Sequence, residues 1–352
     1  MPSFRSGTVI EVLVDRPGLQ RCLVDGDTDP GRPSGPGGDG PERVYVLVDQ
    51  VGPVAVGDQV VFNTTAVDLG LGTGGWHVVH WNLSRGDWSR PGPGHIMKQR
   101  YTSLQTDTGA AEEHRDPGRD LRGRPVVACT LLSQMAVVAT VYRSLRPDDR
   151  IVYVMTDGAA LPLALSDLVV TLRDAGLVDA TVTAGHAFGG DREAVSMPSA
   201  LAIAVDELDA DVVIVAMGPG VVGTDSALGT TAVEAAWILD TAAVLGGTPI
   251  LCVRASGADP RPRHRGASHH VDTVLSLTTN PVDVAVVADA IPALGHHRAI
   301  QPDPEPDVLA ILSDQGLRVT SMGRGPEDDP LFYESAGAAG AVAARRRAER
   351  DG

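Results

Sequence analysis

The stretch Asp211-Val-Val-Ile-Val-Ala-Met-Gly-Pro-Gly-Val-Val-Gly-Thr-Asp-Ser226 joins a short apolar run to a glycine-rich loop. Apolar, β-branched runs of this length that stop at a turn predict buried strands. Comparable runs end near residues 130, 155, 183, 253 and 288. Alanine-rich segments of helical length lie between most of them, at residues 133–145, 161–175, 193–208, 226–245 and 269–277. This alternation predicts an α/β fold with a Rossmann-like parallel sheet flanked by helices.

The chain before this region has a different pattern. Its short β-branched runs are separated by glycine and proline and show no helical period; they lie at residues 7–15, 43–49, 54–62 and 76–83. We therefore expect a small β-barrel or sandwich over residues 1–85. The Gly/Pro/Asp tract at 25–41 reads as a long hairpin loop within it. A connecting segment follows at 86–124, and the α/β domain spans 125–350.

The end of the α/β domain carries two further predicted features. A helix–strand pair is expected at residues 307–316 and 318–321, and an Ala/Arg-rich terminal helix is expected up to about residue 350.

The composition excludes several classes of protein. Apolar residues make up 43% of the 352 residues and aromatic residues only 4%, which favours a core of Val, Leu, Ile and Ala, as in a parallel sheet. The formal net charge of −16 argues against a protein whose main task is binding nucleic acid or an anionic membrane. No secretory signal and no run of 18 apolar residues is evident. We expect a cytoplasmic protein with no membrane partner.

Cysteine usage gives no sign of a disulfide framework or a thiolate metal site. Cys22, Cys129 and Cys252 are odd in number, lie far apart and form no C-x-x-C pair. Cys129 and Cys252 lie in apolar strand patterns, so we expect both thiols to be buried.

Positive charge gathers at one place in this acidic chain, between residues 254 and 270. This stretch holds one aspartate, Asp259, and four arginines, Arg254, Arg261, Arg263 and Arg265, a charge of 4 − 1 = +3 before any histidine is protonated. It follows the apolar run at 249–253. Guanidinium and imidazole groups at the end of a strand suit an anionic ligand or a metal ion. The alternative is a solvated, proline-stiffened loop.

Polar or glycine-rich loops follow four successive predicted strands, at residues 156–162, 184–192, 217–226 and 254–270. In an open parallel sheet, ligands bind beyond the carboxyl ends of the strands. We therefore expect these loops to meet at one rim and form a pocket, the alternative being ordinary connections.

The loop after the fourth strand fits the pattern G-x-G-x-x-G. Glycine allows backbone amides to approach an anion, so Gly218, Gly220, Gly223 and Thr224 are predicted to bind it, with Arg261, Arg263 and Arg265 supplying charge. A dinucleotide is disfavoured, because the motif does not follow the first strand and no acidic residue ends the next strand. We therefore do not expect NAD or FAD as a cofactor. In a competing interpretation, Thr224, Asp225 or Ser226 caps the following helix.

Candidate acid/base residues come from the same loops: His186, His264 and His269, with Asp157 or Asp225 as the orienting partner. Asp157 could equally form an Asx turn. A divalent metal is a further possibility, with candidate ligands His186, Asp191, Asp225, His264, His269 and His270. Because neighbouring side chains diverge on a strand or helix, at most one of His269 and His270 is expected to share a site with His264.

Several segments together resemble a bacterial protein family known only as a domain of unknown function. They are Leu-Gly-Thr-Gly-Gly (71–75), Pro-Gly-His-Ile-Met-Lys (93–98), Met-Gly-Pro-Gly-Val-Val-Gly-Thr (217–224), Asp-Pro-Arg-Pro-Arg-His-Arg-Gly (259–266) and Ser-His-His (268–270). The resemblance covers nearly the whole chain and implies a complete single-chain member. It implies no activity, substrate or catalytic residue.

Three hypotheses about function follow. The first is a hydrolase or transferase, or an enzyme-like binder, for a small phosphorylated or carboxylated ligand at the rim. The second is a non-enzymatic regulatory or scaffold homodimer that uses the Arg/His stretch for docking. The third is single-stranded RNA binding through the barrel, on a platform of Trp76, His77, His80 and Trp81, although core packing of these rings is the favoured alternative.

Overall fold

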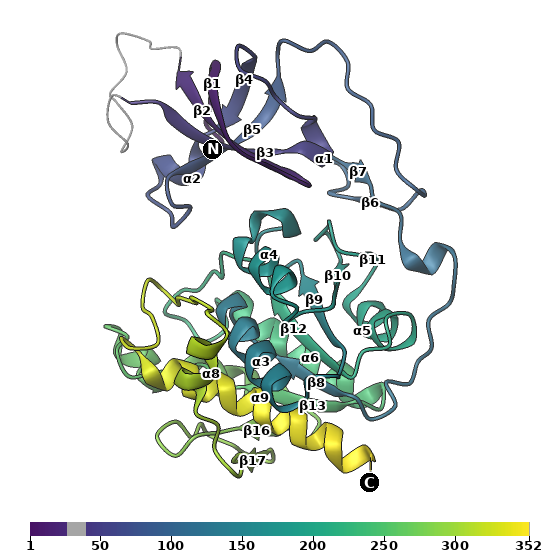
Figure 1. Ribbon diagram of the computed structural model, residues 1–352, viewed down its shortest axis with the longest axis vertical. Coiled ribbons are helices and arrows are strands. Elements are labelled where there is room, and N and C mark those ends of the chain that lie inside the picture. Colours follow the sequence, from purple (N-terminus) through teal and green to yellow (C-terminus); the bar gives the residue numbers. More distant parts are fainter. Residues whose placement is uncertain (27–39, 352) are drawn as a thin grey trace. The chain divides into compact units, whose positions relative to one another are not determined.

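The computed structural model describes residues 1–26 and 40–351. The chain forms two compact units, Met1–Thr108 and Gly109–Gly352, and their boundary falls within the segment 86–124 (Figure 1). Most of the hairpin loop predicted at 25–41 lies outside the described residues.

The first unit is a closed β-barrel, one of the two architectures that the sequence pattern predicted. Its strands are β1 (Phe4–Arg16), β2 (Leu19–Gly26), β3 (Glu42–Leu47), β4 (Gln59–Asn63) and β5 (Trp76–Asn82), joined in the order β1-β2-β3-β5-β4. β3 and β5 are parallel, whereas the other pairs are antiparallel. Alternate residues such as Val44, Val46 and Phe62 fill the interior because side chains alternate between the faces of a strand.

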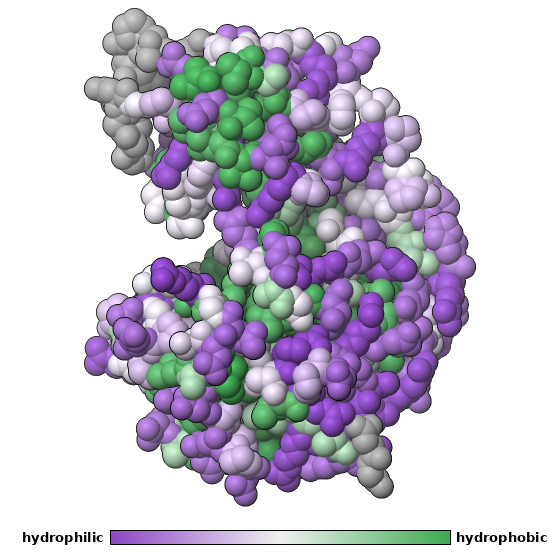
Figure 2. All heavy atoms as spheres, in the orientation of Figure 1, coloured by the Kyte–Doolittle hydropathy of each residue, from purple (hydrophilic) through white to green (hydrophobic). Residues whose placement is uncertain are grey.

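Short elements complete this unit: α1 (Val48–Val51), α2 (Thr65–Asp68) and the paired strands β6 (Met97–Lys98) and β7 (Thr106–Asp107). Figure 2 shows apolar residues gathered over the barrel strands, and Phe4, Ile10 and Leu13 of β1 are among the exposed apolar side chains of the unit.

The second unit contains an eight-stranded parallel sheet, which confirms the predicted Rossmann-like α/β fold. The strands are β8 (Pro125–Ala128), β9 (Ile151–Thr156), β10 (Ala180–Ala184), β11 (Arg192–Ala194), β12 (Val212–Met217), β13 (Thr248–Cys252), β16 (Asp283–Ala285) and β17 (Arg298–Ile300). Their order is β11-β10-β9-β12-β8-β13-β16-β17, and every pairing is parallel. The chain runs from β8 to β9 and on toward β11 at one edge of the sheet, and then from β12 to β13 and on toward β17 at the other edge. The direction of winding therefore reverses near β12, β8 and β13, and parallel sheets bind ligands where the winding reverses.

Helices cover both faces of this sheet. One face carries α3 (Leu132–Leu145), α4 (Asp167–Asp174), α8 (Val308–Asp314) and α9 (Pro330–Asp351), and the other carries α5 (Met197–Asp206), α6 (Glu234–Val244) and α7 (His269–Leu277). Within the described residues, no helix is long and apolar enough to span a membrane.

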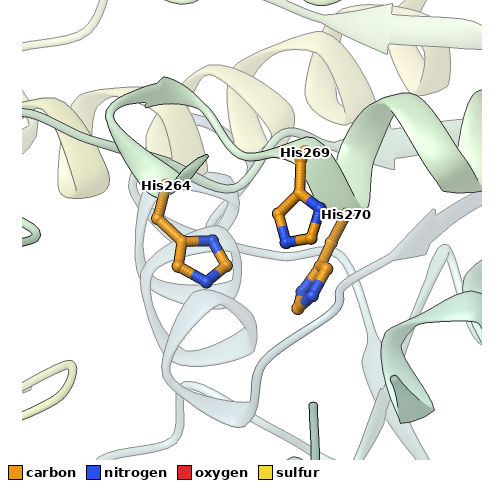
Figure 3. A group of neighbouring side chains, drawn as sticks. All are labelled: His264, His269 and His270. Atoms are coloured by element: carbon orange, nitrogen blue, oxygen red, sulfur yellow. The ribbon is translucent and has the colours of Figure 1, made fainter. Parts of the chain in front are cut away.

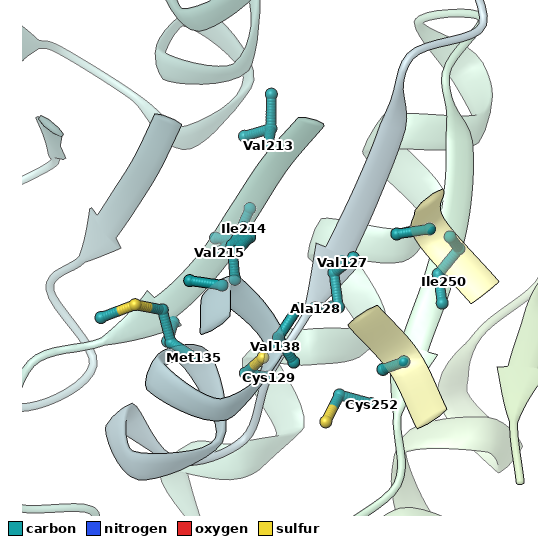
Figure 4. Close-up of a cluster of buried hydrophobic side chains, with 14 of the residues drawn as sticks. Val127, Ala128, Cys129, Met135, Val138, Val213, Ile214, Val215, Ile250 and Cys252 are labelled. Carbon is teal, nitrogen blue, oxygen red and sulfur yellow. The ribbon is translucent and has the colours of Figure 1, made fainter. Parts of the chain in front are cut away.

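The core is built from aliphatic side chains and small residues (Figure 4). Val127, Ile214 and Ile250 are fully buried between the helical layers, and both Cys129 and Cys252 are buried as expected. α3 and α9 cross closely at Gly340, where an added Cβ would lie only 2.7 Å from the carbonyl oxygen of Val138. Glycine is needed there because a larger side chain would push the two helices apart.

Several element boundaries differ from the prediction. α4 begins only at Asp167, because Ser166 caps it and a 3-10 turn, η2 (Leu163–Leu165), precedes it. Residues Arg192–Ala194 pair with β10, so the predicted helix at 193–208 shortens to α5, which Ser196 caps. Residues 318–321 form no strand, only an isolated bridge between Ser321 and Arg324.

Candidate functional site

The Arg/His stretch forms a hairpin beyond the carboxyl end of β13. Strands β14 (Ala255–Ser256) and β15 (Gly266–Ala267) pair antiparallel, and the turn between them contains the 3-10 helix η4 (Pro262–His264). The turn is built around Asp259, whose carboxylate accepts hydrogen bonds from Arg261 Nε (2.9 Å) and Nη2 (2.8 Å). The Arg261 guanidinium holds the pKa of Asp259 well below its usual range. Arg265 Nε donates to the carbonyl oxygen of Asp259 (3.0 Å). Two of the three arginines predicted to bind the ligand therefore take part in holding the turn.

Helix α7 begins directly after the hairpin and brings three histidines together. Ser268 is its N-cap, with Oγ accepting from the backbone N–H of His270 (3.3 Å) and bonding to Nδ1 of His264 (2.7 Å). His269 and His270 are the first two residues of the helix. The ring centroid of His264 lies 5.1 Å from that of His269 and 5.0 Å from that of His270, so the three rings lie close together (Figure 3).

The expectation that only one of His269 and His270 joins His264 is wrong. Candidate ligand atoms of all three lie within 4.8 Å of one another. Divergence along a helix was the basis of that expectation. His264, however, stands on η4 before the cap, and its ring lies at similar distances from both neighbours. Two rings that diverge at their Cα atoms can still converge on a third.

His264 and His270 are buried and His269 is partly exposed, and several of their ring nitrogens have no hydrogen-bond partner. His264 and His270 are 2% and 3% exposed. Both ring nitrogens of His270 and Nε2 of His269 are buried without a partner in the structure. Buried polar atoms are nearly always satisfied in folded proteins, so this group of unsatisfied nitrogens is an exception that a purely structural role does not explain.

The electrostatics keep the three rings neutral. Burial, followed by the charge of Arg254, lowers the pKa of His264 to about 3. Burial and the neighbouring His269 lower the pKa of His270 to about 4, and burial together with Arg263 lowers that of His269. Neutral imidazoles offer lone pairs at neutral pH, to a proton or to a transition metal.

Arg254 is the unusual charge of this site. It is 6% exposed, and burial lowers its pKa to about 10, so it remains a cation at neutral pH. Within the described part of the chain, its guanidinium forms no ion pair with a carboxylate, whereas Arg261 pairs with Asp259 and Arg263 with Asp225. The sequence reading counted Arg254 in the positive stretch but did not place it among the ligand-binding residues.

The loops after β12 and β13 meet at this point. Arg263 Nη2 lies 2.7 Å from Asp225 Oδ1, although the Asp225 side chain is 85% exposed. A Cβ on Gly223 would lie 3.2 Å from Cε1 of His270, so Gly223 packs closely against this ring. The structure thus brings part of the predicted glycine loop against the predicted Arg/His stretch.

The glycine loop itself is held by its own hydrogen bonds. The amide of Val222 donates to Oγ1 of Thr231 (3.2 Å), and that of Thr224 donates to the carbonyl of Gly229 (2.7 Å). A Cβ on Gly218 would lie 2.5 Å from the carbonyl oxygen of Ala160. Gly218 is therefore required for packing.

The N-cap interpretation of Thr224, Asp225 and Ser226 is wrong. Thr230 caps the 3-10 helix η3 (Thr231–Val233), and α6 starts only at Glu234. No helix N-terminus therefore follows directly on the glycine loop.

Asp157 and His186 belong to a second polar cluster, at the ends of β9 and β10. Asp157 Oδ2 accepts from the backbone N–H of His186 (2.9 Å). Beside them, Thr156 Oγ1 donates to Oε1 of Glu234 (2.7 Å). Burial raises the pKa of Glu234 to about 7, and the charge of Asp157 contributes. Sequence reasoning missed Glu234, although a single carboxylate within the apolar segment 232–239 was a usable signal.

Among the described residues, the structure shows one group of three or more potential metal ligands: His264, His269 and His270. The other three candidates lie outside it. Asp191 accepts from the backbone N–H of Thr181 (2.8 Å) and pairs with Arg173, so it ties down its own loop. His186 lies beside Asp157, and Asp225 pairs with Arg263.

A sequence model of the family described as "Protein of unknown function (DUF3866)" matches residues 43–340. No curated protein and no solved structure was found to match the chain. The matched range includes the three histidines, Arg254 and Glu234.

Proposed function

The chain belongs to the DUF3866 family of proteins of unknown function, and because membership indicates no activity, we propose a function from the site itself. The protein binds a small anionic ligand, phosphorylated or carboxylated, at the rim beyond β12 and β13. The observation that carries this proposal is the buried guanidinium of Arg254, which has no carboxylate partner among the described residues and lies beside three neutral histidines.

An anion would resolve an electrostatic imbalance at this site. Burying an unpaired charge costs several kcal/mol, and natural proteins usually offset that cost with a counter-charge. Arg261 already has such a counter-charge in Asp259. Arg254 forms no ion pair with a carboxylate within the described chain, although the charge of Asp259 acts on it, so a phosphate or carboxylate from solution is the natural partner for its planar guanidinium.

The neighbouring groups support a reaction of the hydrolase or transferase class. A neutral imidazole can accept a proton at neutral pH, which gives His264 or His269 the role of general base toward a bound ligand. Next to the His270 ring lies Gly223 of the glycine loop, so the backbone of this loop rather than a bulky side chain borders the histidines. The missing acidic residue after β13 makes a nicotinamide or flavin reaction the weaker proposal.

Substitution of Arg254 tests the anion proposal. Phosphate, sulfate, small carboxylates and nucleotides are screened by thermal shift, and the binders are titrated by calorimetry. A ligand present at 100 times its Kd should stabilise the folded chain by about 2.7 kcal/mol. Arg254→Gln should weaken binding at least about tenfold, since it removes a charged hydrogen bond worth roughly 1.5–3 kcal/mol.

The matched control is Arg345→Gln, because Arg345 is a half-exposed arginine paired with Glu349 on α9. It should leave anion binding unchanged. If no anion stabilises the wild-type chain, the proposal is wrong. Stability that instead rises with protein concentration would favour the scaffold homodimer.

A second candidate function rests on the barrel. Tyr45 and Trp76 stack with ring centroids 4.9 Å apart, and Arg21 lies 5.3 Å from the Tyr45 ring and 5.5 Å from the Trp76 ring. These residues stand on β2, β3 and β5 of a five-stranded barrel, and in oligonucleotide-binding barrels the face of the second and third strands binds the ligand. The platform differs from the predicted one, because His77 is buried and bonded to Glu42. This arrangement favours single-stranded RNA over duplex nucleic acid as the partner of the barrel.

A further inference from the structure

The three-histidine group has the features of a metal centre, and we propose that His264, His269 and His270 bind a divalent transition metal ion, with zinc fitting best, and leave a coordination position open. This inference goes beyond anion binding, because it assigns a resident ion and its ligands.

The geometry suits one shared ion. The ligand atoms lie within 4.8 Å of one another. An ion at about 2.1 Å from each nitrogen brings tetrahedral ligands to about 3.4 Å apart. Each nitrogen therefore has to move by on the order of 1 Å, which small side-chain rotations supply. Figure 3 shows the rings gathered on the same side of the segment that carries them.

The unsatisfied nitrogens distinguish this group from histidines that only fill a core. His296 and His297 are also adjacent, with ring centroids 4.0 Å apart. In that pair, Nε2 of His296 bonds to the carbonyl of Thr279 (3.2 Å) and Nε2 of His297 to that of Leu275 (2.9 Å). Nδ1 of His297 is also buried without a partner, but each ring of that pair has one bonded nitrogen, whereas neither nitrogen of His270 has a partner. A bound ion would satisfy one of the two nitrogens of His270.

The donor set selects the type of metal. Three neutral imidazoles without a carboxylate suit zinc and related transition metals, whereas magnesium and calcium require oxygen ligands. Three protein ligands leave a fourth position for water or substrate, as in catalytic zinc sites. Ser268 orients one ligand, because its hydroxyl holds Nδ1 of His264 and leaves Nε2 for the ion.

The surrounding charge predicts that the metal and the anion bind cooperatively, a consequence that rests on the proposed function. Arg254 is a buried cation in the same hairpin region, and Arg263 stands next to His264 in η4, so the positive charge of both arginines also opposes a dication. An anion in the open position, bonded to Arg254, would reduce this repulsion. Linkage then requires that each ligand raise the affinity of the other by the same factor.

The test uses the full-length chain, stripped with a chelator and then titrated with Zn²⁺ against a chromophoric competitor. Co²⁺ serves as a spectroscopic probe of tetrahedral nitrogen ligation. We expect one ion per chain, and a loss of affinity of at least about 100-fold for each of His264→Ala, His269→Ala and His270→Ala. His296→Ala, from the carbonyl-bonded pair, should bind the ion normally.

A chelator should also lower the Tm of the metal-loaded wild-type chain, and this measurement stands even if a histidine variant fails to fold. No saturable binding by the wild-type chain, or equal binding by all the variants, would falsify the metal site. Adding sulfate should raise the Co²⁺ affinity of the wild-type chain but not that of Arg254→Gln. If sulfate leaves the Co²⁺ affinity of the wild-type chain unchanged, the metal site stands but its coupling to an anion is wrong.

Discussion

Burial decides, residue by residue, which side chains of this chain can carry unusual charge states. Glu234 begins α6 among apolar neighbours, and its carboxyl accepts a hydrogen bond from Thr156 close to Asp157. Burial raises its pKa from 4.5 to about 7. The folded protein therefore keeps a proton on Glu234 between pH 4.5 and 7, where the unfolded chain has released it. The free energy of unfolding must fall as pH rises through this window.

Glu234→Gln should remove this pH dependence. Below pH 4.5 the variant and the wild-type chain should be about equally stable, because Glu234 of the wild-type chain is then protonated in both the folded and the unfolded state. Above pH 7 the variant should be more stable by on the order of 1–3 kcal/mol, because it buries no charge. Urea denaturation from pH 4.5 to 8.5 measures the difference.

Glu349→Gln is the control for this prediction. Arg346 and Arg345 lower the pKa of Glu349, which is 44% exposed, so its neutralisation should change stability little and in the opposite direction. If the difference in free energy of unfolding between the wild-type chain and Glu234→Gln does not change with pH, the assigned burial of Glu234 is wrong.

At the scale of the element, the first turn of α7 links helix formation to the site. Ser268 is fully buried; it caps the helix and holds the ring of His264 with the same hydroxyl. The two residues that it caps are His269 and His270. A single side chain therefore controls where the helix starts and how the three rings are presented.

Ser268→Ala should lower both stability and metal affinity. Loss of an N-cap costs about 1 kcal/mol, and loss of a group that orients a ligand costs about 10–100-fold in metal affinity. Ser196 caps α5 in the same way, through Ser199, and has no histidine partner. Ser196→Ala should therefore show the stability loss alone. Chemical denaturation and Zn²⁺ competition measure the two effects, and equal metal affinities in both variants would rule out an orienting role for Ser268.

At the scale of the whole molecule, the two compact units separate the two candidate functions. The three histidines and Arg254 belong to Gly109–Gly352, whereas the Tyr45–Trp76 stack belongs to Met1–Thr108. Each unit has its own buried cluster, so each is expected to fold alone.

If the chain is divided after Thr108, each fragment should therefore keep the binding activity of its own unit. The fragment 109–352 should bind Zn²⁺ as the full chain does. If the barrel binds single-stranded RNA, the fragment 1–108 should retain that binding at low salt and lose it as salt increases. Filter binding with Trp76→Ala as the matched variant measures it, since stacking on an aromatic ring contributes about 1–3 kcal/mol per base. The absence of binding at low salt would reject the RNA candidate.

The sequence alone determined the α/β sheet, the presence of a small β-barrel or sandwich before it, and the location of the charged stretch. Strand and helix periods are local properties of the chain, and the apolar runs at 212–217 and 248–252 can be read without knowing their neighbours. The edge strands β11 and β17 were not predicted, because three residues leave too short a pattern.

Only the tertiary structure decided which members of that stretch form a site. Sequence reasoning expected Arg261 and Arg265 to face a ligand, but both hold the hairpin through Asp259, and the buried arginine is Arg254. It expected His269 and His270 to diverge, but His264 meets both. Hydrogen-bond partners and burial depend on residues distant in the chain, so no local pattern contains them.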